Sequence, residues 1–262
     1  MTEKQFLAFD AFRNDFKKMI SVWSGAVPNL AALQKDAADE ANTPSYSIET
    51  PVVYNTALDS VTKDDEIKII VIGDNPGKNE QLLINRKYLV GQAGKIGEGF
   101  FRRNPELGID FRRNAIILNK TPVHSAKTAQ LKFIKKAGGT AAEKLLNETQ
   151  LWMAEKTAEI AAVLGAEIWL VGYNDLKPKG LFSLYRDELK KYCSKLGILD
   201  RLLVFQHFSM NRFSIDLKDF MGKNCFNSLQ EAVHALGTLH RDEIFGVQAD
   251  MQNENLRKSI KK

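Results

Sequence analysis

Two polar side chains, those of Asp74 and Asn75, lie between an apolar run and a Pro-Gly pair in the sequence Gly-Asp-Asn-Pro-Gly at 73–77. The preceding residues, 67–72, are mostly β-branched, which is typical of a buried strand of a parallel sheet. Proline fixes one dihedral of the turn that follows, and glycine permits a close approach to the backbone. Open α/β sheets bind their ligands at the carboxyl ends of the strands. We therefore expect Asp74 and Asn75 to face a ligand.

Three other apolar runs have the character of central strands, and polar residues follow each of them. The four runs are 67–72, 115–118, 167–171 and 202–206, and the polar segments after them are 73–77, 119–124, 172–175 and 207–213. Asn, Asp and Gly are also turn formers, so each segment alone is explained by turn chemistry. In a parallel sheet, however, all four segments lie along one edge. Their joint occurrence, with His124 and His207 at two strand ends, indicates a shared site.

Helical segments separate these runs, and strands that alternate with helices predict right-handed crossovers and a parallel sheet. Helices are predicted at about 5–23, 29–41, 92–103, from Thr140 onward, 181–195 and 226–236. Thr-Ala-Ala-Glu at 140–143 is a predicted capping box, Gly237 is predicted to end the last helix, and 42–62 is an irregular connection. We expect an α/β fold, namely a doubly wound three-layer sandwich with a central four-stranded parallel sheet and extra N-terminal helices.

The composition argues against several kinds of site. Two cysteines, Cys193 and Cys225, cannot supply a four-thiolate iron–sulfur site or a Cys-rich zinc site. The chain has no H-E-x-x-H pattern, no Walker loop and no G-x-G-x-x-G fingerprint. We therefore expect no metal and no other cofactor.

The charge and hydropathy of the chain bear on its location and partners. The N-terminus lacks the layout of a secretory signal, and no apolar run approaches the roughly 20 residues that span a bilayer. We expect a cytoplasmic protein without a membrane partner. The net charge of +5 and the pI near 9.0 favour a polyanionic partner. Residues 120–136 contain five lysines and no acid, which solvated helix faces also explain.

The segments at the strand ends resemble the motifs of the uracil-DNA glycosylase superfamily. The sequence at 73–77 matches the G-x-N-P-G form of the family's first motif. His-Phe-Ser at 207–209, with Arg212, is similar to the family's H-P-S motif and the arginine after it. Residues 88–94 are similar to the P-F-V-G-x-A-G segment of the thermophile-type branch, and Asn119 falls where the family keeps its base-reading asparagine.

The resemblance implies that the chain is one α/β domain with a four-stranded parallel sheet. We expect a single domain over 1–262. It consists of an N-terminal helical extension at 1–62, a glycosylase-like core at 65–215, and a C-terminal helix and polar tail at 216–262. The chain departs from the family pattern at Phe208, which replaces proline, and at Leu89, which replaces the aromatic stacker. It also lacks the cysteines of the iron–sulfur branch, so the branch stays open.

The activity implied by this resemblance is base-excision repair of DNA. The enzyme would flip uracil, or a related deaminated base, out of the helix and hydrolyse its N-glycosidic bond. That reaction needs an acceptor that holds water against C1′ and a donor that stabilises the departing base. By resemblance, Asn75 positions the water, Asp74 assists as a base or as a negative charge, and His207 donates to uracil O2.

The resemblance also assigns the residues that bind the base. Asn119 reads the N3–H and O4 edge of uracil, because an amide offers both a donor and an acceptor. Tyr88 stacks on the flipped base, with Phe100 and Phe101 as weaker candidates, and His124 is a further candidate for the pocket. The remaining substrate-binding residues are Gly73, Pro76, Gly77 and Ser209.

DNA is the expected partner, and it must be held while a base leaves the stack. An apolar wedge has to fill the vacated space, and Met210 and Phe213 flank Arg212 on the appropriate loop. Arg212, Lys120 and the lysine-rich segment 125–139 are expected to neutralise phosphates, which makes binding salt-dependent. We expect the protein to be a monomer.

Two other functions stay open. The chain could be a catalytically inactive nucleic-acid-binding protein of the same fold, and Phe208 is one feature that favours this. The block at 172–175 also matches the G-x-N-D block of SGNH-type esterases, and Gly73-Asp74 resembles the start of their G-D-S block. That activity needs a serine nucleophile at the position of Asn75 and a D-x-x-H sequence near the C-terminus, and the chain has neither.

Overall fold

A four-stranded parallel sheet forms the centre of the computed structural model, which describes residues 1–246. In order across the sheet, the strands are β2 (Ala115–Asn119), β1 (Ile69–Gly73), β3 (Glu167–Val171) and β4 (Leu202–Phe205). Ile70 of β1 is in register with Ile116 of β2 and with Ile168 of β3. The predicted four-stranded parallel sheet is confirmed, and each strand falls on its predicted apolar run.

Side chains of successive strand residues face two different apolar cores. Ile70 and Ile72 of β1 belong to one core, whereas Ile69 and Val71 belong to the other. Both faces of the sheet are therefore covered, which explains why the strands read as continuous apolar runs rather than as alternating ones.

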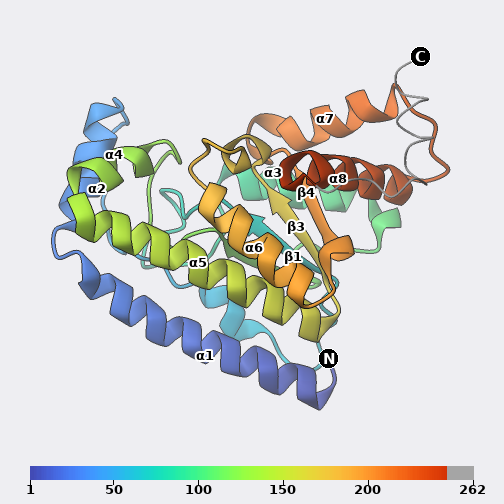
Figure 1. Cartoon of the computed structure of the whole chain (residues 1–262), viewed down its shortest axis with the longest axis horizontal. Coiled ribbons are helices and arrows are strands. Elements are labelled where there is room, and N and C mark those ends of the chain that lie inside the picture. The colour runs from blue at the N-terminus through green and yellow to red at the C-terminus, as the bar shows by residue number, and fades with distance from the viewer. Residues whose placement is uncertain (247–262) are drawn as a thin grey trace.

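Helices cover each face of the sheet (Figure 1). On one side lie α5 (Gly139–Leu164) and α6 (Ser183–Lys195), together with α1 (Glu3–Ala26), α2 (Leu30–Glu40) and α4 (Gln130–Ala137). On the other side lie α3 (Gln92–Arg103), α7 (Arg212–Met221) and α8 (Leu229–Phe245). The result is the expected three-layer α/β sandwich with added N-terminal helices. No helix within residues 1–246 is both long and apolar enough to cross a membrane.

The N-terminal helix α1 begins with a capping box and packs against α5 through aromatic rings. Thr2 Oγ1 accepts a hydrogen bond from the Gln5 amide at 3.2 Å, and Gln5 Oε1 accepts one from the Thr2 amide at 2.9 Å. The rings of Phe12 and Phe16 stack on Trp152 of α5, with centroids 6.2 Å and 5.5 Å away. The aromatic stripe of α1 is therefore part of the core.

Two predicted helix boundaries are wrong. Helix α5 begins at Gly139 after Gly138, with no side-chain cap, so Thr140 does not form the predicted capping box. Helix α8 continues through Gly237 to Phe245. A Cβ atom at Gly237 would lie 2.7 Å from the ring of Phe205, so this glycine serves the close packing of α8 on β4 rather than ending the helix.

Helices α4 and α7 were not predicted. Helix α4 lies in the lysine-rich segment and buries Leu131 and Ile134. Helix α7 begins at Arg212, within the segment that follows β4. The polar tail predicted from about 248 onward lies outside the described residues.

Candidate functional site

The carboxyl ends of all four strands open onto one cavity of about 650 Å³. Asp74 and Asn75 reach it from the end of β1, and Asn119 reaches it from β2. Asp175 follows β3, His207 follows β4, and both line the same cavity. The parallel sheet therefore brings together polar residues that are far apart in the sequence, because the carboxyl ends of its strands lie at the same edge.

Asp74, which lines the cavity, forms an ion pair with the buried Lys120. Lys120 Nζ donates to Asp74 Oδ1 and to the carbonyl of Val171, both at 2.5 Å, and the side chain is fully buried. The expectation that Lys120 contacts DNA phosphates is therefore wrong for this structure. A buried ammonium requires compensating acceptors, and those it has lie inside the fold.

A glycine makes room for this ion pair. Gly172, directly after β3, has φ +98°, and a Cβ atom there would lie 2.5 Å from Asp74 Oδ1 and 3.1 Å from Lys120 Nζ. A side chain would be both conformationally strained and in steric conflict with the pair. Gly172 therefore has a packing role that explains its place in the segment 172–175.

The amide group of Asn75 has a fixed orientation. Its Nδ2 atom donates to Ser125 Oγ at 2.9 Å and to the carbonyls of Ser125 and Pro76, each at 3.1 Å. Because the nitrogen is engaged, Oδ1 is the atom left to accept a hydrogen bond from a ligand or a water molecule. No sequence pattern indicates this role of Ser125.

His124 supports the Pro-Gly turn from outside the cavity. Its Nδ1 donates to the Pro76 carbonyl at 2.8 Å, and its Nε2 lies 2.9 Å from the hydroxyl of Tyr46. Burial lowers the pKa of His124 to about 4, so the ring is neutral at physiological pH and accepts the Tyr46 proton. His124 does not line the cavity, so its candidacy as a pocket residue is wrong.

The ring of His207 is held in one tautomer by Ser209. The Ser209 amide donates to His207 Nδ1 at 3.1 Å, and Ser209 Oγ lies 2.7 Å from the same atom. An Nδ1 atom that accepts a hydrogen bond carries no proton, so the neutral ring carries its proton on Nε2. Burial lowers the pKa of His207, and the nearby charges of Asp74 and Asp175 only partly oppose this effect. His207 is therefore a neutral donor at pH 7.

Asn119 is buried but has an amide atom without a partner. The side chain lines the cavity with 1% of its surface exposed, and its Oδ1 would lie 2.5 Å from a Cβ atom at Gly73. Within residues 1–246, no group hydrogen-bonds to its Nδ2. A buried polar atom left unpaired is costly, so this amide is a natural place for a polar group of a ligand.

Comparisons with known proteins do not assign the chain to a family. No protein-family model, no curated protein and no solved structure matches the chain. The chemistry of the cavity is therefore the basis for a functional assignment.

Tyr88 does not face the cavity, so its predicted stacking on a base is wrong for this structure. Its hydroxyl donates to the Val53 carbonyl at 2.6 Å, and the side chain lines a second cavity of about 530 Å³. The next residue, Leu89, lines the first cavity instead. Phe100 and Phe101, the weaker candidates, are buried in the aromatic core on the α3 side of the sheet.

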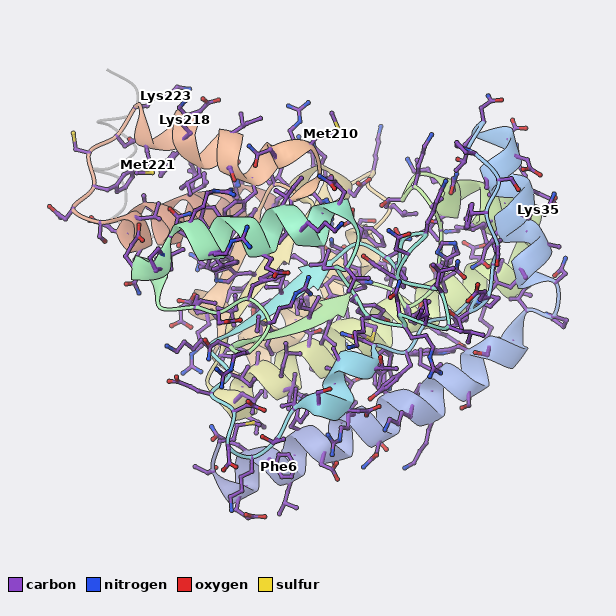
Figure 2. The ribbon with its side chains drawn as sticks, turned by 180° about the vertical axis from the view of Figure 1, so that it is seen from behind. Phe6, Lys35, Met210, Lys218, Met221 and Lys223 are labelled. Carbon is purple, nitrogen blue, oxygen red and sulfur yellow. The ribbon has the colours of Figure 1, made fainter. Side chains whose placement is uncertain are left out.

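The loop after β4 provides one exposed apolar side chain rather than two. Phe213 is 1% exposed and packs against Phe100 with ring centroids 4.8 Å apart, so the prediction that it forms a wedge is wrong. Met210 is 76% exposed and has φ +55°. Figure 2 shows Met210 projecting outward near the N-terminal end of α7. Phe208, which replaces the family's proline, is buried among aromatic rings and anchors this loop to the core.

Glu80 is a cavity residue that no sequence pattern indicated. Its carboxylate accepts a hydrogen bond from the Gly77 amide at 3.1 Å, and the backbone amides of 89–91 lie close to it. Burial raises the pKa of Glu80 to about 7 in spite of these amides. The residue joins the Pro-Gly turn to the segment 89–91, which forms another wall of the cavity. It lies in an ordinary polar run, which gives no signal of burial.

Positive side chains lie at the edge of the cavity. Lys127 and Arg212 are exposed, line the cavity and make no ion pair within the described residues. Lys78 also lines it and lies 4.8 Å from the ring centre of Tyr46. Residues 1–246 contain no group of three or more His, Cys, Asp or Glu side chains that could hold a metal ion. The cavity therefore combines a polar interior with a basic edge.

Proposed function

We propose that the protein is a DNA glycosylase of the uracil-DNA glycosylase superfamily, which removes uracil or a related deaminated base after base flipping. The observation that carries this proposal is the convergence of Asn75, Asn119 and His207, from three strand ends, on one cavity. Its volume of about 650 Å³ is in the range of small-ligand sites and leaves room for a nucleotide.

Base recognition in this proposal depends on Asn119. Its amide offers a donor and an acceptor, which pair with the O4 and N3–H of uracil, and the amide has capacity left for such a ligand. Cytosine presents the reverse pattern at these positions, so it leaves buried polar atoms unpaired and is rejected. Leu89 supplies an apolar surface for the base where an aromatic ring was expected.

Bond cleavage in this proposal depends on His207, Asn75 and Asp74. The bond between the base and C1′ breaks with its electron pair on the base, and His207 Nε2–H donates to the O2 atom on which this charge develops. Asn75 Oδ1 accepts a hydrogen bond from the water whose oxygen bonds to C1′. The Asp74 carboxylate lies beside Lys120, and its negative charge favours the oxocarbenium-like sugar.

The exposed residues around the cavity are suited to holding DNA. Met210 projects into solvent and is long enough to fill the space that a flipped base leaves. Arg212, Lys127 and Lys78 would contact phosphates from the edge of the cavity. Lys120 and Phe213, which are buried, have no part in this contact.

An oligonucleotide assay tests the proposal. The protein is incubated with an end-labelled oligonucleotide that contains one uracil, single-stranded or paired with guanine, and the product is treated with alkali. We expect strand breakage at the uracil position. Asn75→Ala should lower the cleavage rate at least tenfold with an unchanged unfolding temperature, because the water loses its acceptor. Asn14→Ala, which changes an exposed asparagine on α1, should cleave at the wild-type rate.

Two results would contradict parts of the proposal. Wild-type protein that binds the uracil oligonucleotide in a gel shift, but never yields an alkali-labile site, would favour an inactive nucleic-acid-binding protein. Equal cleavage by wild type and Asn75→Ala would remove Asn75 from the mechanism.

A further inference from the structure

Three carboxylates line the cavity, and two of them are already engaged. Asp74 Oδ1 is bonded to Lys120, and Asp74 Oδ2 lies 3.4 Å from Thr128 Oγ1. Glu80 accepts from backbone amides. The third carboxylate, Asp175, has no side-chain hydrogen bond or ion pair to any other residue of 1–246. Both of its oxygens are therefore available to accept hydrogen bonds from a ligand.

The backbone holds Asp175 firmly although its side chain is unpartnered. The residue lies in a short 3-10 helix, Tyr173–Leu176, that directly follows the left-handed turn at Gly172. Its amide donates to the Gly172 carbonyl at 3.1 Å, and its own carbonyl accepts from the Phe182 amide at 3.0 Å. A fixed backbone with a free carboxylate is the arrangement expected for a group that acts on a substrate.

The titratable groups around Asp175 come from four other elements. Asp74 follows β1, Lys120 follows β2, His207 follows β4, and Lys132 lies on α4. Burial raises the pKa of Asp175, and the negative charge of Asp74 raises it further, whereas the other three groups oppose the shift. The carboxylate is therefore a stronger proton acceptor than an ordinary aspartate.

We propose that Asp175 is the general base of the reaction, a role that rests on the glycosidase function proposed above. The water that Asn75 holds forms a bond from its oxygen to C1′ while the bond from C1′ to the base breaks. The water proton moves to the Asp175 carboxylate, and the electron pair of the broken bond leaves with the base, beside His207. No oxidant, reductant or second substrate is needed.

This assignment separates the roles of the two aspartates. Asp74 Oδ1 already accepts a hydrogen bond from the buried Lys120 ammonium, so its charge is engaged inside the fold. Asp175 lacks such a partner and can accept a proton and release it to solvent. Asp175, rather than Asp74, therefore completes the proton transfer.

Substitution at Asp175 tests the proposal in the full-length protein. Asp175→Asn should lower the single-turnover cleavage rate about a hundredfold, because general bases contribute a factor of that order. Its affinity for an oligonucleotide with a cleavage-resistant 2′-fluoro-deoxyuridine should stay within twofold of wild type. Asp36→Asn changes an exposed carboxylate on α2 and is the matched control, with unchanged cleavage.

Chemical rescue distinguishes a base from a residue with a structural role. Asp175→Ala leaves space for a small carboxylate, so added formate should raise the cleavage rate of this variant at least tenfold. Asp74→Ala should not be rescued, because its partner Lys120 is buried beneath the site. The wild-type rate should fall as the pH drops through the raised pKa of Asp175, since only the ionised carboxylate accepts a proton.

The outcomes separate this inference from the proposed function. Wild-type cleavage together with undiminished cleavage by Asp175→Asn would overturn the role of Asp175 and leave the glycosylase function intact. Slow cleavage by Asp175→Asn, together with an Asp175→Ala variant that formate does not rescue, would likewise exclude a base at this position. Failure of wild type to cleave any uracil oligonucleotide would overturn both.

Discussion

The ion pair between Asp74 and Lys120 sets the electrostatics of the cavity where β1 ends. Removing both charges from water costs several kcal/mol for each ion, so the pair persists only with good geometry and further hydrogen bonds. Lys120 has these in the carbonyls of Val171 and Gly73, and its Nζ lies 5.0 Å from the ring centre of Phe182. The lysine therefore links the ends of three strands.

Lys120→Met should destabilise the fold rather than weaken DNA binding directly. The change leaves the Asp74 carboxylate buried without its partner, which costs about 3–5 kcal/mol of unfolding free energy. Urea denaturation of the variant measures this loss. The double variant Asp74→Asn with Lys120→Met should recover part of it, because no uncompensated charge remains. A single variant of wild-type stability with weakened DNA binding would contradict the buried position of Lys120.

Single residues also show what the sequence can and cannot predict about a site. The parallel sheet alone places Asp74, Asn119 and His207 at one edge, so their convergence could be expected from the order of the strands. The direction in which each side chain points could not be expected from the strand order. Tyr88 and Leu89 are neighbours that point into different cavities, and only the packed fold decides which one faces the site.

At the scale of elements, helix α8 approaches β4 unusually closely because it has a glycine at the contact. A Cβ atom at Gly237 would lie 2.8 Å from Leu203 Cβ and 2.7 Å from the Phe205 ring. Glycine lowers helix propensity by about 1 kcal/mol relative to alanine, and this contact outweighs that cost. β4 leads directly into His207, so the packing of α8 also supports the site.

Two glycine substitutions test this packing against helix propensity. Gly237→Ala should destabilise the protein by about 1–3 kcal/mol, because the new methyl group overpacks the contact with β4. Gly25→Ala lies on α1 with no atom within 4 Å of its Cβ position, so it should stabilise the protein by about 0.5–1 kcal/mol. Thermal unfolding of both variants compares them. Stabilisation by both changes would contradict the close approach of α8.

The missed helices show the limit of pattern reading at this scale. Helix α4 has 8 residues in a lysine-rich stretch, and its apolar face is completed only by packing against α2 and α5. Helix α7 starts at Arg212 directly after a turn with left-handed residues Met210 and Asn211, which local propensity does not favour. In contrast, the four strands can be predicted from the sequence. They are buried on both faces, so each is a continuous apolar run.

Across the whole molecule, the groups that could meet DNA lie around the cavity, and α1 lies on the opposite side of the protein. Figure 2 shows Met210 and Phe6 at opposite ends of the view, with Met210 near the start of α7 and Phe6 on α1. Lys127 and Arg212 line the cavity from different segments of the chain. The net charge of +5 is a property of the whole chain, whereas in the proposed function these local charges would decide where a polyanion binds.

The salt dependence of DNA binding should identify this face. Each phosphate contact contributes close to one unit to the slope of log affinity against log salt concentration. The double variant Lys127→Ala with Arg212→Ala should therefore lower the slope by about two units, measured by fluorescence anisotropy on a uracil oligonucleotide. Lys4→Ala removes an exposed charge two residues before Phe6 on α1 and should leave the slope unchanged. If Lys4→Ala lowers the slope and the double variant does not, DNA binds near α1, away from the strand-end cavity, and base extrusion into that cavity has no route.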